Sequence, residues 1–149
     1  MSSNPDNKRP QRSEFVYFQT ATTRWMDNDI YGHVNNVQYY SFFDSVVNQF
    51  LIERGELDIR KGDSIGFVVH SQCNYYQPVQ YPEVIEVGMR ANRIGNSSVE
   101  YGVAIFKADQ AEGCAYGTFT HVFVNRSSQR PTQLPEKLRH ALNSLLITD

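Results

Sequence analysis

The stretch VQYYSFFDSVVNQFLIER, residues 37–54, carries the strongest structural signal in the chain. Its apolar residues recur at helical spacing and form one stripe, which contains Tyr39, Tyr40, Phe43, Val46, Val47, Phe50 and Leu51. Further apolar residues widen the stripe and leave only a narrow polar face, made of Gln38, Ser41, Ser45 and Asn48. The pattern predicts a helix from about Asn36 to Arg54 that is buried over most of its circumference.

Segments on both sides of this helix have the aromatic, β-branched and alternating residues that are typical of strands. One such segment precedes the helix and four follow it, at residues 15–25, 64–76, 84–91, 99–108 and 114–124. Pro135 then opens a short helix. Consecutive strands with short connections favour an antiparallel sheet. We therefore predict an α+β protein in which a curved five-stranded antiparallel sheet wraps around the long central helix, with a short C-terminal helix.

Length and composition favour one domain in an intracellular setting. A chain of 149 residues is long enough to form its own core, and its polar start predicts a flexible tail over residues 1–13 before a single domain at 14–149. No apolar run approaches the ~20 residues of a membrane helix, and a net charge of -2 gives no general attraction to nucleic acid or anionic membranes. Cys73 and Cys114 have no ligand-like spacing and suit reduced thiols, which favours a cytoplasmic location.

The segment RWMDNDIYGHVNN, residues 24–36, gathers two carboxylates, a histidine, a glycine and two asparagines directly before the long helix. Asp27 and Asp29 have the chemistry of a general base or a nucleophile, although aspartates in loops more often serve as turn or capping groups. The first N–H groups of a helix lack partners within it and attract negative charge. The segment therefore indicates either a structured turn or a site that combines a carboxylate with a helix terminus.

A metal site is disfavoured in this segment. Asp27, Asp29 and Gly32 match the first, third and sixth positions of a calcium-binding EF-hand loop, but Gln38 stands where the bidentate glutamate is required. His33 adds one nitrogen, and no further ligand cluster lies nearby in the sequence. We expect no metal and no cofactor.

From about Phe15 to Leu146 the sequence resembles the hotdog-fold acyl-CoA thioesterases of the 4-hydroxybenzoyl-CoA thioesterase type. The resemblance is strongest over residues 24–36 and weaker at YYQPV (75–79) and RIGNSS (93–98). Met26 is a departure, because such enzymes usually carry glycine before the first aspartate. The resemblance implies hydrolysis of an acyl-CoA substrate without a prosthetic group. It also implies a homodimer, or a tetramer built from two dimers, with the active site at the subunit interface.

The resemblance also implies roles for individual residues. Asp29 aligns with the catalytic carboxylate of the family, acting as general base or nucleophile, whereas Asp27 is expected to hold the loop. We expect His33 to orient the carboxylate or the thioester, and the helix terminus at Asn36 to polarise the thioester carbonyl. The residues expected to contact substrate are Tyr31, Gly32, Asn35, Tyr39, Arg93, Ser97 and Ser98.

Two other functions are compatible with the same fold. The first is a non-catalytic module that binds acyl-CoA, and the second is a hotdog hydratase or dehydratase. An intact Asp29 favours hydrolysis over simple binding, and a hydratase would need a different arrangement of histidine and acid. The acyl group itself has no signature in the sequence.

Overall fold

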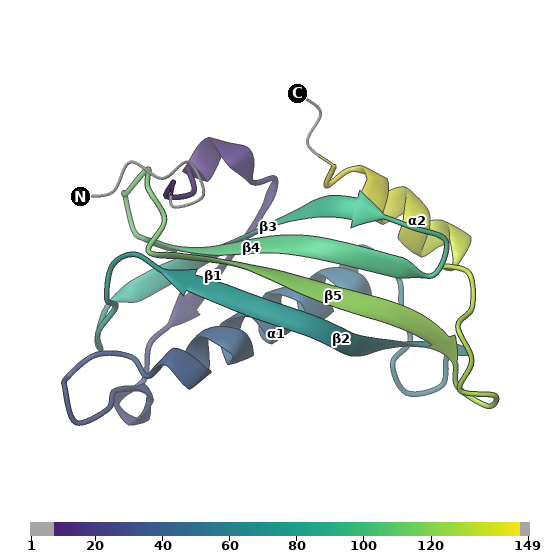
Figure 1. The fold of residues 1–149 in the computed structure, drawn as a ribbon, viewed down its shortest axis with the longest axis horizontal. Coiled ribbons are helices and arrows are strands. Elements are labelled where there is room, and N and C mark those ends of the chain that lie inside the picture. Colours follow the sequence, from purple (N-terminus) through teal and green to yellow (C-terminus); the bar gives the residue numbers. More distant parts are fainter. Residues whose placement is uncertain (1–7, 147–149) are drawn as a thin grey trace.

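The computed structural model describes residues 8–146, which form a five-stranded sheet, two α-helices and two short 3-10 helices (Figure 1). The main elements are β1 (Tyr17–Thr22), α1 (Asn36–Glu53), β2 (Ser64–Tyr75), β3 (Val84–Ile94), β4 (Ser98–Lys107), β5 (Ala115–Asn125) and α2 (Glu136–Asn143). The predicted α+β class and order of elements are confirmed. β1 is shorter than predicted, because a 3-10 helix over Trp25–Asp27 follows it instead of further strand.

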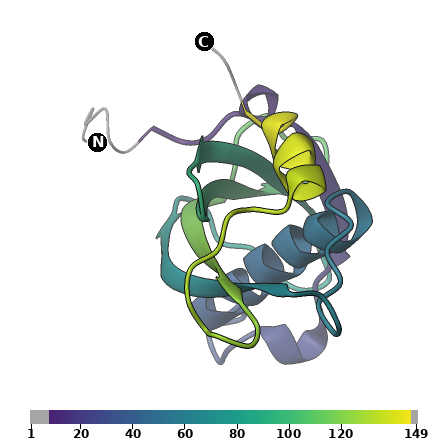
Figure 2. The ribbon, with the colours of Figure 1, turned by 90° about the vertical axis from the view of Figure 1, so that its right-hand side faces the viewer.

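All strand pairs are antiparallel, and the order across the sheet is β1-β3-β4-β5-β2. The sheet curves around α1, and α2 lies beside the same enclosed space (Figure 2). Alternate residues of β3 and β4 face this space and are fully or almost fully buried: Ile85, Val87, Met89, Ala91, Val99, Tyr101, Val103 and Ile105. Each large apolar side chain in such a core contributes about 1.5–3 kcal/mol through burial. This architecture is the hotdog fold.

One face of α1 packs against the sheet, and its buried residues are Tyr39, Phe43, Val46, Val47, Phe50 and Leu51. The opposite face is open to solvent, where Val37 is 71% and Ile52 is 45% exposed. Burial over most of the circumference is therefore wrong for the single chain. The physical reason is that one curved sheet covers only one side of a helix. Phe42 still packs partly against the core, but Val37 and Ile52 lie beyond the cover that residues 8–146 provide.

The edge strand β2 is exposed along most of its length. Within residues 8–146 it pairs only with β5, and its burial pattern contains no fully buried residue. Three consecutive apolar residues, Phe67, Val68 and Val69, are 44%, 49% and 58% exposed. A long apolar edge strand is a template for pairing with another chain.

The chain before β1 is hydrogen-bonded to the rest of the domain as far back as Arg9, whereas residues 1–7 of the expected flexible tail lie outside the described residues. Arg12 donates hydrogen bonds to the backbone oxygens of Lys107 and Gln110 at 3.1 and 3.0 Å, and its guanidinium lies 4.9 Å from the centre of the Phe106 ring. Pro10 is buried. Residues 8–14 therefore cover the outer face of the sheet.

A polar pair interrupts the apolar core. His121 on β5 is 2% exposed, and its Nδ1 lies 3.2 Å from the hydroxyl of the fully buried Tyr101 on β4. Phe119 and Phe123 pack edge-on against the imidazole. Burial lowers the pKa of His121 to about 4 from an ordinary value of 6.5, because an apolar environment disfavours the charged form.

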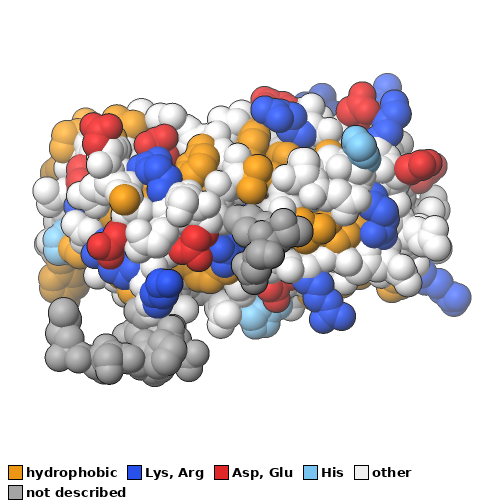
Figure 3. Space-filling view, turned by 90° about the horizontal axis from the view of Figure 1, so that it is seen from above, with side chains coloured by type: hydrophobic (Ala, Val, Ile, Leu, Met, Phe, Trp, Pro, Cys, Tyr) orange, Lys and Arg blue, Asp and Glu red, His pale blue; other side chains and the backbone are white. Residues whose placement is uncertain are grey.

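Charged side chains are mixed on the outside of the molecule. The face in Figure 3 carries acidic and basic groups interspersed, without a large area of one sign. This distribution agrees with the net charge of -2. None of the helices among residues 8–146 is long and apolar enough to cross a membrane.

Candidate active site

Asp27 holds the two ends of the loop that leads into α1. Its carboxylate is 1% exposed and accepts hydrogen bonds from the backbone N–H of Arg24 at 2.8 Å and from Nη2 of Arg24 at 2.9 Å. Its backbone oxygen accepts the N–H of Asn35 at 2.8 Å. Asp27 therefore fixes the loop at its start and at its end, which is the structural role expected for it.

Asp29 lies at the turn of the same loop and is partly exposed. Its Oδ1 accepts the backbone N–H of Tyr31 at 2.9 Å, and its backbone oxygen accepts the N–H of Gly32 at 3.0 Å. The chain reverses at Gly32, whose φ of +81° is a conformation that glycine adopts without strain. The second carboxylate oxygen of Asp29, Oδ2, has no hydrogen-bond partner within residues 8–146. That oxygen is free to act on a ligand.

The N-terminus of α1 adjoins this loop. Asn35 caps the helix, because its Oδ1 accepts the N–H of Val37 at 3.0 Å and its backbone oxygen accepts the N–H of Gln38 at 2.9 Å. The N–H of Asn36, the first helical residue, has no acceptor in the described part of the chain. A free donor at the positive end of an 18-residue helix attracts an oxygen that carries negative charge.

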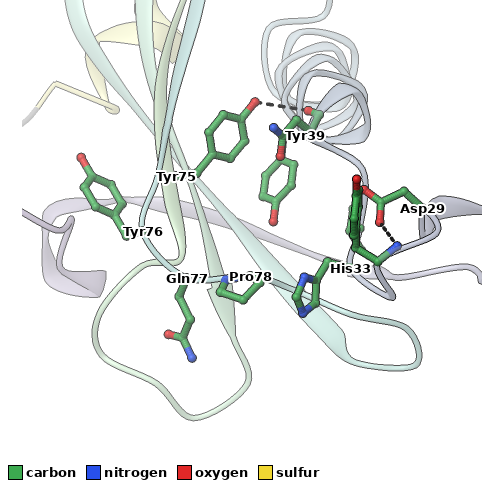
Figure 4. Close-up of a pocket in the computed structure, with 10 residues that line it drawn as sticks. Asp29, His33, Tyr39, Tyr75, Tyr76, Gln77 and Pro78 are labelled. Atoms are coloured by element: carbon green, nitrogen blue, oxygen red, sulfur yellow. Dashed lines mark hydrogen bonds between the residues drawn. The ribbon is translucent and has the colours of Figure 1, made fainter.

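These groups line one pocket of about 380 Å³ (Figure 4). Five predicted residues contribute to its lining: Asp29, Tyr31, His33, Asn36 and Tyr39. The loop and helix form one wall, and the opposite wall is the end of β2 with the residues after it, 75–78. The pocket therefore brings the free carboxylate oxygen of Asp29 and the free helix terminus to the same cavity.

Other predicted residues do not line this pocket. Gly32 and Asn35 shape its loop and cap its helix. Arg93, Ser97 and Ser98 belong to the β3–β4 hairpin, which α2 contacts through a hydrogen bond from Arg139 to the backbone oxygen of Gly95. The loop that carries Asp29 (residues 23–35, the site loop) lies at the other end of β3. There the backbone N–H of Thr23 donates a hydrogen bond to the backbone oxygen of Glu83, directly before β3. Eleven residues of strand separate the two ends by roughly 30 Å, so one chain does not bring this hairpin to Asp29.

His33 lines the pocket as an exposed side chain. Its backbone oxygen accepts the N–H of Asp29 at 2.9 Å. Among the described residues its imidazole forms no hydrogen bond with the Asp29 carboxylate, so the expected orientation of the carboxylate by this side chain is not seen. Asp29 is held instead by the backbone of Tyr31 and Gly32.

Two tyrosines from distant parts of the chain meet at the pocket. The rings of Tyr39 and Tyr75 pack edge to face with centroids 4.9 Å apart, and the Tyr75 hydroxyl donates to the backbone oxygen of Asn36 at 3.3 Å. Burial, with Cys114 nearby, raises the pKa of Tyr39 to about 12, and burial also raises the pKa of Tyr75 above its usual range. Both phenols are therefore neutral at physiological pH.

Sequence reasoning did not assign Tyr75, Tyr76, Gln77 or Pro78 to the site. The segment YYQPV carried a weak resemblance to the family, but nothing local in it indicates a pocket wall. Tyr75 ends β2 opposite Ala115 of β5, and this pairing brings it to the N-terminus of α1. The available signal was the position of these residues at the end of a strand and directly after it.

No group of three or more His, Cys, Asp or Glu side chains with the spacing of a metal site occurs within residues 8–146. The pocket combines instead a carboxylate with a free oxygen, a helix N–H donor and neutral phenols. This chemistry suits attack on a carbonyl group: the carboxylate supplies a base or nucleophile, and the helix terminus stabilises the developing oxyanion.

The curved sheet around α1 and the carboxylate loop before it define a hotdog-fold protein of the thioesterase kind. Residues 23–142 match the model of the Thioesterase-like superfamily. Since this match covers most of the chain, the protein belongs to that superfamily.

Individual proteins of known sequence or structure resemble this chain. The PA5185 protein of Pseudomonas aeruginosa PAO1 is 55% identical, with a TM-score of 0.92 over 95% of this chain and 99% of its own. Slr0204, a 1,4-dihydroxy-2-naphthoyl-CoA thioesterase from Synechocystis, shares the fold with a TM-score of 0.78 at 17% identity, over 87% of this chain and 96% of its own. The uncharacterized protein YsmA of Bacillus subtilis is 22% identical over 133 residues, 88% of each chain.

Proposed function

We propose that the protein is an acyl-CoA thioesterase, which hydrolyses an acyl thioester to a carboxylic acid and free CoA. The observation that carries the proposal is the shared pocket of Asp29 and the N-terminus of α1. Membership of the Thioesterase-like superfamily supports it, as does the shared fold with a naphthoyl-CoA thioesterase. Cys73 and Cys114 are free thiols, which suits a cytoplasmic enzyme.

Asp29 performs the central step by one of two routes. As a general base, it takes a proton from water while the water oxygen attacks the thioester carbon; the C–S bond then breaks and the thiolate recovers a proton. As a nucleophile, a carboxylate oxygen attacks the same carbon, CoA thiolate leaves, and water cleaves the resulting anhydride. Both routes need an oxygen that is not engaged by the protein, and Oδ2 fits that need.

The N-terminus of α1 stabilises the carbonyl oxygen as negative charge develops on it. The free N–H of Asn36 is the donor, and the cap at Asn35 keeps the first turn in place. A single donor of this kind typically changes turnover by about 10²–10³. The His33 imidazole lines the pocket but forms no hydrogen bond with the Asp29 carboxylate, so we assign His33 to positioning the thioester.

The working unit in this proposal is a homodimer, alone or paired into a tetramer, with each site at the interface. The exposed edge of β2 supports an isologous pairing of two copies through this strand. The second copy would also cover the apolar residues on the exposed face of α1. When two β2 strands pair antiparallel, the start of one lies beside the end of the other. This arrangement moves the partner's β3–β4 hairpin toward the pocket, so that Arg93, Ser97 and Ser98 act on CoA bound by the other chain.

Release of free thiol from acyl-CoA tests the proposal directly. Purified protein is incubated with a panel of acyl-CoA thioesters. The released CoA thiol is measured by the absorbance change when it reacts with a chromogenic disulfide reagent. Turnover that depends on Asp29 is the expected result. Tight binding of acyl-CoA without thiol release would instead identify a non-catalytic binding module, and addition of water across an enoyl-CoA double bond would identify a hydratase.

A further inference from the structure

Tyrosine is the most frequent residue type in the lining of the pocket. Tyr31 and Tyr39 contribute from the loop and from α1, whereas Tyr75 and Tyr76 contribute from the end of β2. The cavity of about 380 Å³ is near the lower end of the range for small-molecule sites. Figure 4 shows Tyr39 and Tyr75 together beside the helix terminus. An acyl group whose carbonyl meets Asn36 therefore has these two rings as its first neighbours.

Tyr75 forms one wall of the pocket, held on its inner side while its residue is 40% exposed on the edge strand. Its hydroxyl is held by the backbone oxygen of Asn36 at 3.3 Å, its ring packs at 87° against Tyr39, and its backbone pairs with Ala115. Beyond this pair the structure is closely packed, since Tyr39 is 3% exposed and Phe43, one turn later on α1, is fully buried. A long acyl chain that runs inward past the Tyr39–Tyr75 pair therefore meets packed side chains of α1.

Within one chain, the pocket lining offers no lysine or arginine to an acyl group. No Lys or Arg lines the pocket in the described part of the chain, and its ionisable groups besides the tyrosines are Asp29 and His33. Arg9 bonds the side-chain oxygen of Gln77 at 2.9 Å but does not itself line the cavity. An acyl group with its own carboxylate would therefore lose hydration beside Asp29 without gaining an ion pair.

We infer that the pocket selects a short, uncharged acyl group, aliphatic or aromatic, and that Tyr75 sets the length limit. This inference rests on the proposed function, because it concerns the acyl group of the same thioester. It adds a substrate class and a specificity-determining residue. The phenols stay neutral over the working pH range, so this selection does not depend on their ionisation.

The test compares kcat/KM for butanoyl-, benzoyl-, octanoyl-, dodecanoyl- and glutaryl-CoA. A hydrophobic pocket discriminates by roughly 10–200-fold for a misfitted methylene. The wild-type enzyme should therefore favour butanoyl- and benzoyl-CoA over dodecanoyl- and glutaryl-CoA by at least about 100-fold. A preference for dodecanoyl- or glutaryl-CoA overturns the inference.

Substitutions of Tyr75 then locate the limit. Tyr75→Ala should raise the octanoyl-to-butanoyl ratio of kcat/KM by at least about 10-fold, because removal of the ring lengthens the cavity. Tyr75→Phe keeps the ring and should keep that ratio, and Tyr75→Leu serves if the alanine variant has a lowered melting temperature. Ile59→Ala, at an exposed position in the loop between α1 and β2, is the control for a remote substitution. An unchanged ratio in folded Tyr75→Ala and Tyr75→Leu assigns the limit elsewhere.

Binding of acyl-CoA thioethers separates this inference from the proposed function. Thioethers replace the reactive carbonyl and are not hydrolysed, so calorimetry ranks the acyl groups whether or not the protein is an enzyme. Absence of turnover with a short-chain preference in binding rejects the thioesterase and keeps the pocket assignment. Turnover with tighter binding of long-chain thioethers keeps the thioesterase and rejects the length limit.

Discussion

Arg24 and Asp27 form a closed pair at the start of the site loop, with the Arg24 N–H 2.8 Å from Oδ2 and Nη2 2.9 Å from Oδ1 of Asp27. Both carboxylate oxygens of Asp27 are therefore occupied, and the side chain is 1% exposed. Asp29, two residues later, has only Oδ1 engaged and lines the pocket. The two aspartates are chemically identical, but only one is available to a substrate.

Asp29→Asn should lower turnover of a cleavable acyl-CoA by about 10²–10⁴, the range for loss of a general base. The amide oxygen still accepts the N–H of Tyr31, so the loop keeps its shape and the melting temperature should change little. Steady-state kinetics and thermal melting measure the two effects. Turnover within a few-fold of the wild-type value would remove Asp29 from the mechanism.

Asp27→Asn is the matched control, since it makes the same chemical change in the same loop. It weakens the charge-assisted bonds to Arg24 in a buried position, and we expect a loss of about 1–3 kcal/mol in the free energy of unfolding. At about 2–4 °C per kcal/mol this lowers the melting temperature by several degrees. If turnover collapses in Asp27→Asn and survives in Asp29→Asn, the catalytic carboxylate has been assigned two residues too late.

Activity should not depend on a metal ion. The prediction rests on the chemistry of the pocket, in which a carboxylate and a helix N–H supply the base and the oxyanion donor. Thiol release is measured before and after dialysis against a strong chelator, with and without added zinc or manganese. Equal rates are expected, whereas loss of activity that either metal restores would require a metal-assisted mechanism.

Local patterns in the sequence predicted the elements of this fold well. Helical spacing from Tyr39 to Leu51 and alternation from Ile85 to Ala91 each report which side of an element is apolar. Both sets are buried, except that Tyr40 is only half-buried. The helical spacing does not report how much of the circumference of α1 the sheet covers. Val37 and Ile52 are as apolar as residues of the buried stripe, but the single sheet does not reach them.

Features that depend on distant pairing were less accessible. Nothing within β2 indicates that it is an edge strand, because that depends on its joining β5 rather than β3. The pocket wall at Tyr75 has the same origin. Asp27 and Asp29 differ in their hydrogen-bond partners because Arg24 folds back onto Asp27 alone, and two acidic residues separated by one position in the sequence do not reveal this.

We predict that the protein is at least a dimer through the β2 edge. Light scattering at micromolar concentration should give a mass of about 34 kDa, twice that of the 17.1 kDa chain, or a multiple of it. Val68→Lys puts a charge into the exposed edge and should shift the population toward monomer. Ile59→Lys, at a position of equal exposure (48% against 49%), should leave the mass unchanged. A wild-type monomer would reject the shared-site arrangement.

Stability should fall on mild acidification because of His121. Its pKa is lowered to about 4 in the folded protein, so the folded state keeps the imidazole neutral while the unfolded chain takes up a proton below pH 6.5. The stabilising contribution is complete above pH 6.5 and is lost as pH falls toward 4, by about 2 kcal/mol at pH 5. Urea unfolding at pH 7.5 and pH 5 measures the loss.

Because carboxylates titrate in the same pH range, the informative quantity is the difference in stability loss between the wild type and His121→Gln. The glutamine keeps a hydrogen-bond partner for the Tyr101 hydroxyl but does not titrate. The variant should lose less stability than the wild type between these two pH values. Equal losses would mean that the buried imidazole is not the group that responds to acid.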